Sequence, residues 1–293
     1  MKDWATAGPG IAAAIGIAMM IAWAGAQHGV TLGGWSVFLL CGIFAFLVQW
    51  VVFVHAWLTH SERFFDLTGS ITYIVMVLAA VLLGGASDPR ALLLAGLIVV
   101  WAGRLGPFLY NRIKNAGEDR RFRSMRHSFP MFLMTWTLQG TWVFITACCA
   151  LAAITTTRPV APDLWLVAGL LLWLAGFTLE VVADRQKSAF RANPANAHRY
   201  IDSGLWAWSR HPNYFGEMVL WLGIAVIAWP VLQGWQYATL ISPVFVFVLL
   251  RYISGVRMLD YRARKMWGDE PEYQAYRRQT PMLIPKRPRP TSA

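Results

Sequence analysis

The chain has 293 residues, of which 57% are hydrophobic and only 14% are charged. A soluble domain carries roughly 25% charged residues, so this composition excludes a water-soluble fold, which could not bury so much apolar surface. The formal net charge is +11, and clustered lysines and arginines can indicate nucleic-acid binding. The positions of these cations along the chain indicate a membrane surface instead.

Eight apolar runs follow one another along the sequence. A bilayer core of about 30 Å needs roughly 20 apolar residues per helix, so each run is a candidate span. The runs are Ile11–Ala26, Trp35–Leu58, Leu67–Ala86, Ala91–Tyr110, Met131–Ile154, Leu164–Ala183, Tyr214–Leu232 and Trp235–Val256. The sequence therefore predicts an all-α fold, a polytopic integral membrane bundle of seven to eight transmembrane helices.

The basic residues gather in three segments that eight spans place on one side of the membrane. These segments are 112–126, 185–210 and the tail from Arg257, and the opposite connections are short and almost uncharged. The positive-inside rule then predicts that both termini are cytoplasmic and that the chain is a multi-pass protein of the cell inner membrane. We expect membrane lipids, and no nucleic acid, as partners of these cations.

Ionisable residues divide the chain into two unlike parts. The first four runs contain few of them, whereas the chain from Asp184 onward contains many. We therefore expect a division near residue 130, with a substrate pocket in residues 1–130 and a cofactor site in residues 131–293. The polar linker Arg112–Phe129 fits a topology determinant or a contact with anionic lipid, and a cofactor role is the alternative.

The sixth run continues into a polar segment that contains Asp184, Lys187 and Arg191. If this segment is helical, the three side chains share one face, because residues three, four and seven positions apart are neighbours on a helix. Glu180 lies one turn earlier, inside the apolar run, where a charge is costly unless it faces protein or water and so indicates function. The alternative is that Glu180 and Asp184 only pair with nearby arginines.

The most specific pattern in the chain is Arg210-His211-Pro-Asn213-Tyr214-Phe-Gly-Glu217. The proline can begin a helix, because the first helical residue does not use its amide hydrogen. In that helix Asn213, Glu217 and Trp221 line one face, where an amide and a carboxylate can bind ribose hydroxyls or a carboxamide. Arg210 and His211 suit a phosphate, to which arginine presents a bidentate fork.

The segment after the last run carries Asp260 and Arg264 one turn apart. It is typical of a basic helix on the membrane surface, and the alternative is that it closes over the same polar site. The sequence contains no spacing typical of a metal site. Its three cysteines all lie in apolar runs, where cysteine packs as a small hydrophobic residue.

These residues carry a resemblance to a known family. From about Gly176 to Pro285 the chain resembles the steroid 5α-reductase family, in particular its bacterial homologues. The wider group also contains the sterol C14-reductases and the isoprenylcysteine carboxyl methyltransferases. The resemblance runs through Asp184, Arg191, Arg199, Gly204-Leu, Asn213-Tyr-Phe-Gly-Glu217, Trp221 and Leu283-Ile-Pro.

The resemblance implies a membrane-embedded enzyme that uses NADPH, bound on the cytoplasmic side, to reduce the C4–C5 double bond of 3-oxo-Δ4 steroids. His198 stands where the family has a tyrosine, and Tyr200, two residues later, can take the place of that tyrosine. Asp260 and Arg264 fall near the last cofactor contacts of the family. Together with the pattern above, the predicted cofactor-binding residues are Asp184, Lys187, Arg191, Arg199, Tyr200, His211, Asn213, Tyr214, Glu217, Trp221, Asp260 and Arg264.

The implied reaction needs a group that stabilises an enolate. Negative charge develops on the 3-keto oxygen, and a hydrogen-bond donor or acid in a water-poor pocket stabilises it best. In the family a glutamate and a tyrosine of the N-terminal helices hold the ketone, and the position of that tyrosine corresponds to Trp101 here. The predicted catalytic residues are Asp66, Tyr73 and Arg104, with Glu62 as a further candidate. The alternative for Asp66 is a helix cap.

Two other functions fit parts of the pattern. The Arg-His-Pro motif also occurs in membrane methyltransferases that bind S-adenosylmethionine on the same helix face. Against this alternative, Arg191 and Arg199 suit a dinucleotide with a 2′-phosphate better than a cationic sulfonium. A non-catalytic sterol- or lipid-binding scaffold is the third possibility, and the polar residues at every cofactor position disfavour it.

Overall fold

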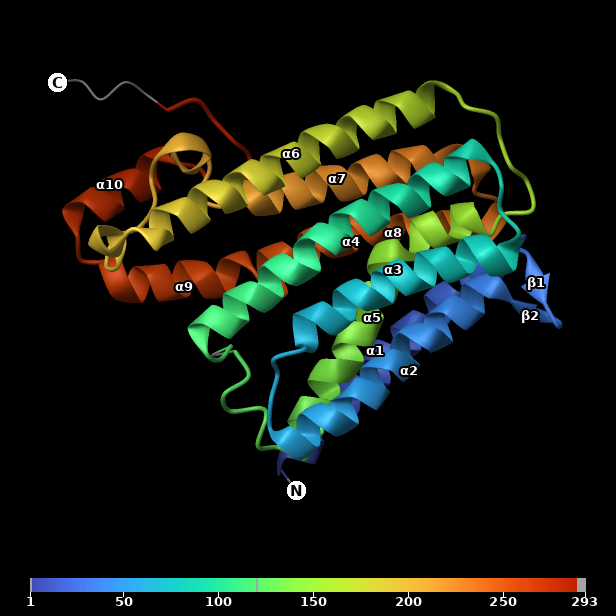
Figure 1. The fold of residues 1–293 in the computed structure, drawn as a ribbon, viewed down its shortest axis with the longest axis horizontal. Coiled ribbons are helices and arrows are strands. Elements are labelled where there is room, and N and C mark those ends of the chain that lie inside the picture. Colours follow the sequence, from blue (N-terminus) through green and yellow to red (C-terminus); the bar gives the residue numbers. More distant parts are fainter. Residues whose placement is uncertain (1, 120, 289–293) are drawn as a thin grey trace. The chain divides into compact units, whose positions relative to one another are not determined.

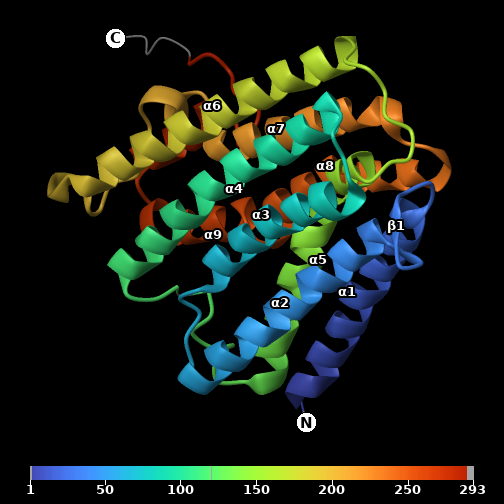
Figure 2. The ribbon, with the colours of Figure 1, turned by 45° about the vertical axis from the view of Figure 1, so that its right-hand side comes forward.

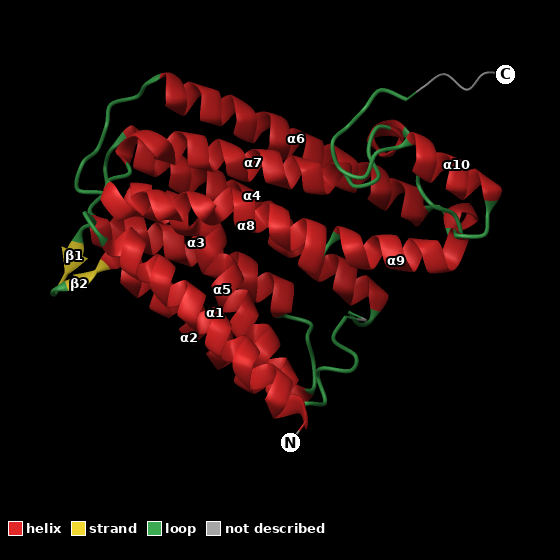
Figure 3. Ribbon diagram, turned by 180° about the vertical axis from the view of Figure 1, so that it is seen from behind, coloured by secondary structure: helices red, strands yellow, loops and turns green. Residues whose placement is uncertain are grey.

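The computed structural model describes residues 2–119 and 121–288, and helices make up nearly all of its regular structure (Figure 1; Figure 3). The helices are α1 (Lys2–Ala26), α2 (Val37–Thr59), α3 (Phe65–Gly84), α4 (Pro89–Ala116), α5 (Phe129–Ile154), α6 (Leu164–Ala192), α7 (Pro212–Ala228), α8 (Ile241–Val248), α9 (Val256–Trp267) and α10 (Pro271–Gln279). Shorter 3₁₀ helices are Pro194–Asn196, Gly204–Ala207, Trp229–Val231 and Gly234–Leu240, and Leu249–Ile253 is a π-helical turn. Two short strands, β1 (Thr31–Leu32) and β2 (Trp35–Ser36), pair as an antiparallel hairpin.

Eight helical segments of the described chain are long and apolar enough to cross a membrane. The predicted all-α bundle and its number of spans are therefore confirmed. Several helices extend beyond the apolar runs at their polar ends: α4 continues to Ala116 and α6 to Ala192. The reason is that the backbone hydrogen bonds of a helix continue through charged residues at which hydropathy falls.

The chain forms two compact units. The first comprises Met1–Val167 with Ala225–Ser242, and the second comprises Ala168–Ile224 with Pro243–Ala293. In the first unit α5 is the central helix: every residue from Val143 to Ile154 is buried, and α1, α2 and α3 pack against it (Figure 2). A helix that is apolar on all sides suits such a position. The division of function near residue 130 concerns where ligands bind, and it stays a prediction.

A buried arginine begins α4. Asp88 caps this helix by accepting from the amides of Arg90 and Ala91 at 3.1 and 3.0 Å. The side chain of Arg90 is only 1% exposed, and its guanidinium donates to the carbonyls of Ile227 and Ala161 at 2.7 and 3.1 Å. An ion pair with Asp163 at 2.9 Å completes its partners. Arg90 therefore fastens α4 to two other segments of the first unit.

In the second unit, α6 and α7 lie side by side (Figure 1; Figure 2) with their backbones in contact at glycines. A Cβ atom at Gly176 would lie 2.5 Å from the carbonyl of Gly216, and one at Gly216 would lie 2.6 Å from the carbonyl of Gly176. About two turns further along α7, a Cβ atom at Gly223 would lie 2.6 Å from the carbonyl of Gly169. Small residues permit this close approach between membrane helices. The close neighbour of Gly216 is therefore the backbone of α6.

Candidate functional site

The contact between α6 and α7 brings two predicted site residues together. Asp184 lies two turns before the end of α6 and Asn213 in the first turn of α7. The side-chain amide of Asn213 donates to the carboxylate of Asp184 at 3.1 Å. Glu180 is buried one turn earlier on α6, and Glu217 is partly buried one turn later on α7. The result is a group of carboxylates and one amide on adjoining helices.

A second cluster surrounds the buried carboxylate of Asp260 in α9. The guanidinium of Arg210 approaches it to 2.5 Å, that of Arg264 to 3.2 Å and that of Arg277 to 3.7 Å. The sequence pattern indicated the first two arginines but not Arg277, which comes from the last turn of α10. A basic residue in a short polar helix has no distinguishing signal, so only the fold reveals its partner. Three cations around one carboxylate give this cluster an excess of positive charge.

His211 is buried beside this cluster. Burial, and then the charges of Lys187 and Arg210, lower the pKa of His211 to about 3, so its ring is neutral near pH 7. The ring stacks on Tyr214 with centroids 5.7 Å apart. Its Nδ1 atom is buried and has no hydrogen-bond partner among the described residues. A neutral imidazole with a vacant nitrogen can donate to or accept from a ligand.

Aromatic residues hold the connection between α6 and α7 in place. Lys187 lies over the ring of Trp206 at 4.7 Å, and the indole of Trp206 donates to the carbonyl of Ala183 at 3.1 Å. The hydroxyl of Tyr276 donates to the carbonyl of Trp206 at 2.7 Å, and burial raises the pKa of Tyr276. Tyr200 stacks on Tyr276 with centroids 5.3 Å apart. These contacts give Lys187 and Tyr200 a packing role in addition to any contact with a ligand.

Three predicted cofactor residues differ from the others in their surroundings. Arg191 at the end of α6 and Arg199 in the following loop are exposed, and no described carboxylate lies within ion-pair distance of either. Both guanidiniums are therefore available to an anion. Trp221 is fully buried within the second unit. Its position on the face of Asn213 and Glu217 stays a prediction about the cofactor.

In the first unit, Asp66 lies in the first turn of α3 but does not cap it, because the cap position belongs to Phe64. Its carboxylate pairs with Arg121 at 3.4 Å and with Arg112 at 3.9 Å. An ionised carboxylate only accepts hydrogen bonds. Paired in this way, Asp66 is better suited to positioning the arginines than to donating to a ketone.

Tyr73 and Arg104 lie on neighbouring helices of the first unit. The ring of Tyr73 is buried and meets Trp101 of α4 edge to face, with centroids 5.2 Å apart. Arg104 lies one turn beyond Trp101, with its guanidinium 5.0 Å from the ring of Phe108. The residue before Tyr73 on α3 is Thr72, and the side-chain amide of buried Gln49 donates to its hydroxyl at 2.9 Å. The surroundings of Tyr73 are thus mostly apolar with a few polar side chains.

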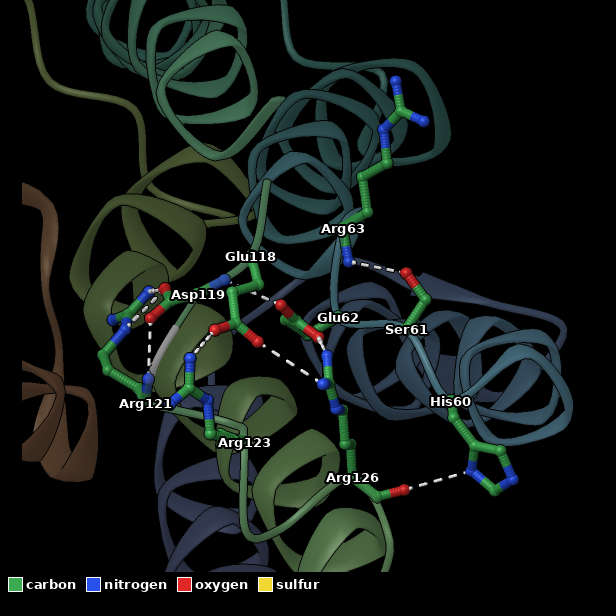
Figure 4. A network of polar contacts seen from close by, with 9 residues as sticks. All are labelled: His60, Ser61, Glu62, Arg63, Glu118, Asp119, Arg121, Arg123 and Arg126. Carbon is green, nitrogen blue, oxygen red and sulfur yellow. Dashed lines mark hydrogen bonds and ion pairs between the residues drawn. The ribbon is translucent and has the colours of Figure 1, made fainter. Parts of the chain in front are cut away.

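Glu62 belongs to a network that fastens the described part of the linker between α4 and α5 (Figure 4). Its carboxylate accepts from the backbone amide of Asp119 at 2.7 Å and pairs with Arg126 at 3.5 Å. The Nδ1 atom of His60 lies 3.3 Å from the carbonyl of Arg126. Burial opposes ionisation of Asp119, but the hydrogen bond and charge of Arg121 outweigh it, so the pKa of Asp119 is lowered. Through these contacts, Glu62 anchors the linker between α4 and α5.

The donor set of the second unit fits a phosphate-bearing nucleotide. Arginine binds phosphate with parallel hydrogen bonds, and the buried Nε atoms of Arg210 and Arg277 have no partner among the described residues. The carboxylates of Asp184 and Glu217 suit ribose hydroxyls, which donate hydrogen bonds. Within the described chain, no group of three His, Cys, Asp or Glu side chains is placed to hold a metal ion.

Comparison with known proteins adds the family. The profile of a family described as a protein of unknown function, DUF1295, matches residues 50–280. The chain is also similar to 3-oxo-5-alpha-steroid 4-dehydrogenase 1 of Bos taurus, with 32% identity over 96 residues, which cover 31% of this chain and 35% of that protein. The protein of the same name from Mus musculus is 32% identical over 72 residues, 25% of this chain and 28% of its own length.

These matches span no more than about a third of the curated relatives, 35% of the bovine and 28% of the mouse protein. The family profile, by contrast, covers most of the chain, including the polar residues of both units. The predicted resemblance is therefore confirmed at the level of the family. The chain belongs to the DUF1295 family, a steroid 5α-reductase-like family of membrane proteins.

Proposed function

We propose that this chain is a membrane-embedded, NADPH-dependent reductase of the C4–C5 double bond of 3-oxo-Δ4 steroids. The observation that carries the proposal is the cluster of Arg210, Arg264 and Arg277 around buried Asp260. Its excess positive charge suits the pyrophosphate and 2′-phosphate of NADPH better than the sulfonium of S-adenosylmethionine. The name of the similar bovine and mouse proteins, 3-oxo-5-alpha-steroid 4-dehydrogenase 1, supports the substrate class.

In this proposal the residues of the second unit bind and orient the cofactor, which supplies the hydride when bound. Arg191, Arg199 and Arg210 bind its phosphates through charge-assisted hydrogen bonds. Asp184 and Glu217 accept hydrogen bonds from ribose hydroxyls. The low pKa of His211 keeps its ring neutral, so that it forms hydrogen bonds without adding a charge to the site.

The substrate site is proposed for the helices of the first unit. A steroid needs a mostly apolar cleft with one or two polar anchors, which matches the surroundings of Tyr73. The hydroxyl of Tyr73 donates to the 3-keto oxygen as negative charge develops there, and Arg104 adds positive charge nearby. Asp66 keeps Arg112 and Arg121 in position through its ion pairs.

In this proposal the chain lies in the inner membrane with its cofactor site facing the cytoplasm. The three basic segments support this assignment because cytoplasmic loops carry an excess of lysine and arginine. Both termini then lie on the same side as the cofactor site.

The proposal is tested with the full chain purified in detergent. Mass spectrometry of the nucleotide that copurifies should identify NADP, and incubation with testosterone and NADPH deuterated at C4 should yield a dihydro product that contains deuterium. Copurified S-adenosylmethionine or its homocysteine product would instead establish a methyltransferase. Protein that binds neither nucleotide and leaves testosterone unchanged would establish a lipid-binding scaffold.

A further inference from the structure

Helix α9 begins where the last candidate span must leave the hydrocarbon core. The segment Gly234–Trp267 contains 34 residues, whereas roughly 20 are enough to cross the core. Its first part ends in the π-helical turn Leu249–Ile253. Gly255 then interrupts the helix with φ −106° and ψ −102° before α9 starts at Val256. The residues of α9 therefore lie at the level of the lipid headgroups and beyond.

The two faces of α9 differ in chemistry. Val256, Asp260 and Trp267 are buried, and they fall on one stripe because successive helical residues are about 100° apart. Arg262 and Lys265 fall on the opposite side and Arg257 on the flank between the two, and all three are exposed. The helix is therefore anchored to the second unit by one stripe and directs its cations outward.

The outward cations have no counter-charge within the described chain. No described carboxylate forms an ion pair with Arg257, Arg262 or Lys265. Arg264 differs from them, because it pairs with Asp260 at 3.2 Å. Two large side chains of this helix are also exposed, Tyr261 at 65% and Met266 at 57%. Tyr261 lies between Arg257 and Lys265 around the helix, and Met266 lies beside Arg262.

We propose that the outward face of α9 binds the headgroups of anionic phospholipids. A lysine or arginine near an anionic membrane surface is attracted by about 1 kcal/mol, so three unpaired cations favour such lipids strongly. Tyrosine suits the interface because its ring is apolar and its hydroxyl polar. Tyr261 and Met266 supply the apolar contact with the lipid, and Arg257, Arg262 and Lys265 bind its phosphate.

The same helix links this lipid site to the cluster around Asp260. Asp260 is one turn from Arg257 and Arg264, and its carboxylate holds Arg210 and Arg277 on the buried side. Lipid bound to the outer face holds α9 in the position in which these ion pairs form. This coupling rests on the proposed function, and it means that bound anionic lipid raises the affinity for NADPH.

The experiment compares the full chain in nanodiscs of phosphatidylcholine alone with nanodiscs that also contain phosphatidylglycerol. The test variant is Arg257→Ser/Arg262→Ser/Lys265→Ser. The matched control, Arg257→Lys/Arg262→Lys/Lys265→Arg, changes the same three positions but keeps their positive charges. Melting temperature reports lipid binding directly, and titration with NADPH reports the coupling.

Phosphatidylglycerol should raise the melting temperature of the wild type and the control by more than it raises that of the test variant. It should also raise the NADPH affinity of the wild type by about fivefold or more, the size of a typical coupling between sites. An equal rise in melting temperature for test and control variants would overturn the lipid site. A lipid-dependent rise in melting temperature with unchanged NADPH affinity would overturn the coupling. Absence of NADPH binding in both lipids would refute the proposed function, while the melting temperatures would still decide the lipid site.

Discussion

The guanidinium of Arg210 lies 2.5 Å from the carboxylate of Asp260, which is 50 residues further along the chain. Both side chains are largely buried, at 11% and 7% exposed. Arg264 reaches the same carboxylate from the surface, with its side chain 54% exposed. The two ion pairs therefore differ in solvation although they share one partner, and they should differ in their contribution to stability.

We expect Asp260→Asn to lower the free energy of unfolding by about 3–5 kcal/mol, because it leaves buried guanidinium charge without compensation. Arg264→Gln should cost about 0–1 kcal/mol, as is usual for an exposed pair. Thermal unfolding of the two variants in the same detergent measures the difference. Equal losses in both variants would show that burial does not set the strength of these pairs.

Removing either exposed arginine of the proposed phosphate site, Arg191 or Arg199, should weaken the binding of NADPH. Charge-assisted hydrogen bonds contribute about 1.5–3 kcal/mol each, so Arg191→Ala and Arg199→Ala should each raise the dissociation constant for NADPH by about tenfold or more. Arg185→Ala is the matched control, since Arg185 is an exposed cation of the same helix α6. Isothermal titration with NADPH distinguishes them, and normal binding by both test variants would remove these arginines from the site.

Substitutions at Tyr73 and Asp66 should separate catalysis from stability. Loss of a hydrogen bond to a developing oxyanion costs roughly 10²–10³ in kcat, so Tyr73→Phe should reduce testosterone turnover by that factor with unchanged NADPH affinity. Asp66→Asn should mainly lower the melting temperature, because it breaks the ion pairs with Arg112 and Arg121. Kinetics and melting curves of both variants are the measurement. Full turnover in both would leave Arg104 as the next candidate.

The topology is tested by single cysteines in exposed positions. The three native cysteines are buried, so membrane-impermeant maleimide should label only the new ones. Ser124→Cys and Ala195→Cys should be labelled from the cytoplasm and Arg158→Cys from the opposite side, because basic loops stay cytoplasmic. Labelling of positions 124 and 158 from the same side would contradict the arrangement with eight spans.

Stability should fall as the pH is lowered through the range in which only the unfolded chain protonates His211. Its pKa is about 3 in the fold against 6.5 for an unperturbed histidine, so the unfolded state binds more protons between these values. The stabilisation is complete above pH 6.5 and is lost as the pH falls toward 3. From pH 6.5 to 5 the loss is about 1.5–2 kcal/mol, since one proton contributes roughly 1.4 kcal/mol per pH unit.

Melting curves of the wild type and His211→Gln across this range measure the effect. The variant should vary less with pH than the wild type, because it lacks the titrating group. The same slope in both proteins would mean that another group titrates in this window.

The sequence predicts the number and order of the helices because hydropathy is a local property. Each run from Ile11 to Val256 contains its own signal, and all eight spans are found. The π-helical turn Leu249–Ile253 and the break at Gly255 lie within the last predicted run, and hydropathy alone predicts neither of them. Packing, and not composition, decides where that helix changes its hydrogen-bond pattern.

The site is predictable to the extent that its residues lie on one helix face. Asp184 and Asn213 were singled out by spacing and by resemblance, and the fold joins them at 3.1 Å. The contact of Arg277 with Asp260 and that of Glu62 with the backbone of Asp119 depend on segments distant in sequence. Such contacts require the tertiary arrangement, which no local pattern contains.

Glycines bring the backbones of α6 and α7 into direct contact. With Gly176 against Gly216 and Gly169 against Gly223, an added Cβ at Gly176, Gly216 or Gly223 would collide with the opposite helix. Asp184 and Asn213 are therefore carried on one rigid frame, and a ligand that binds both does not have to draw the helices together first. A single methyl group at Gly216 would force the helix axes apart and shift the side chains of Asp184 and Asn213 together. The absence of Cβ atoms at these glycines therefore determines how precisely the two side chains are positioned.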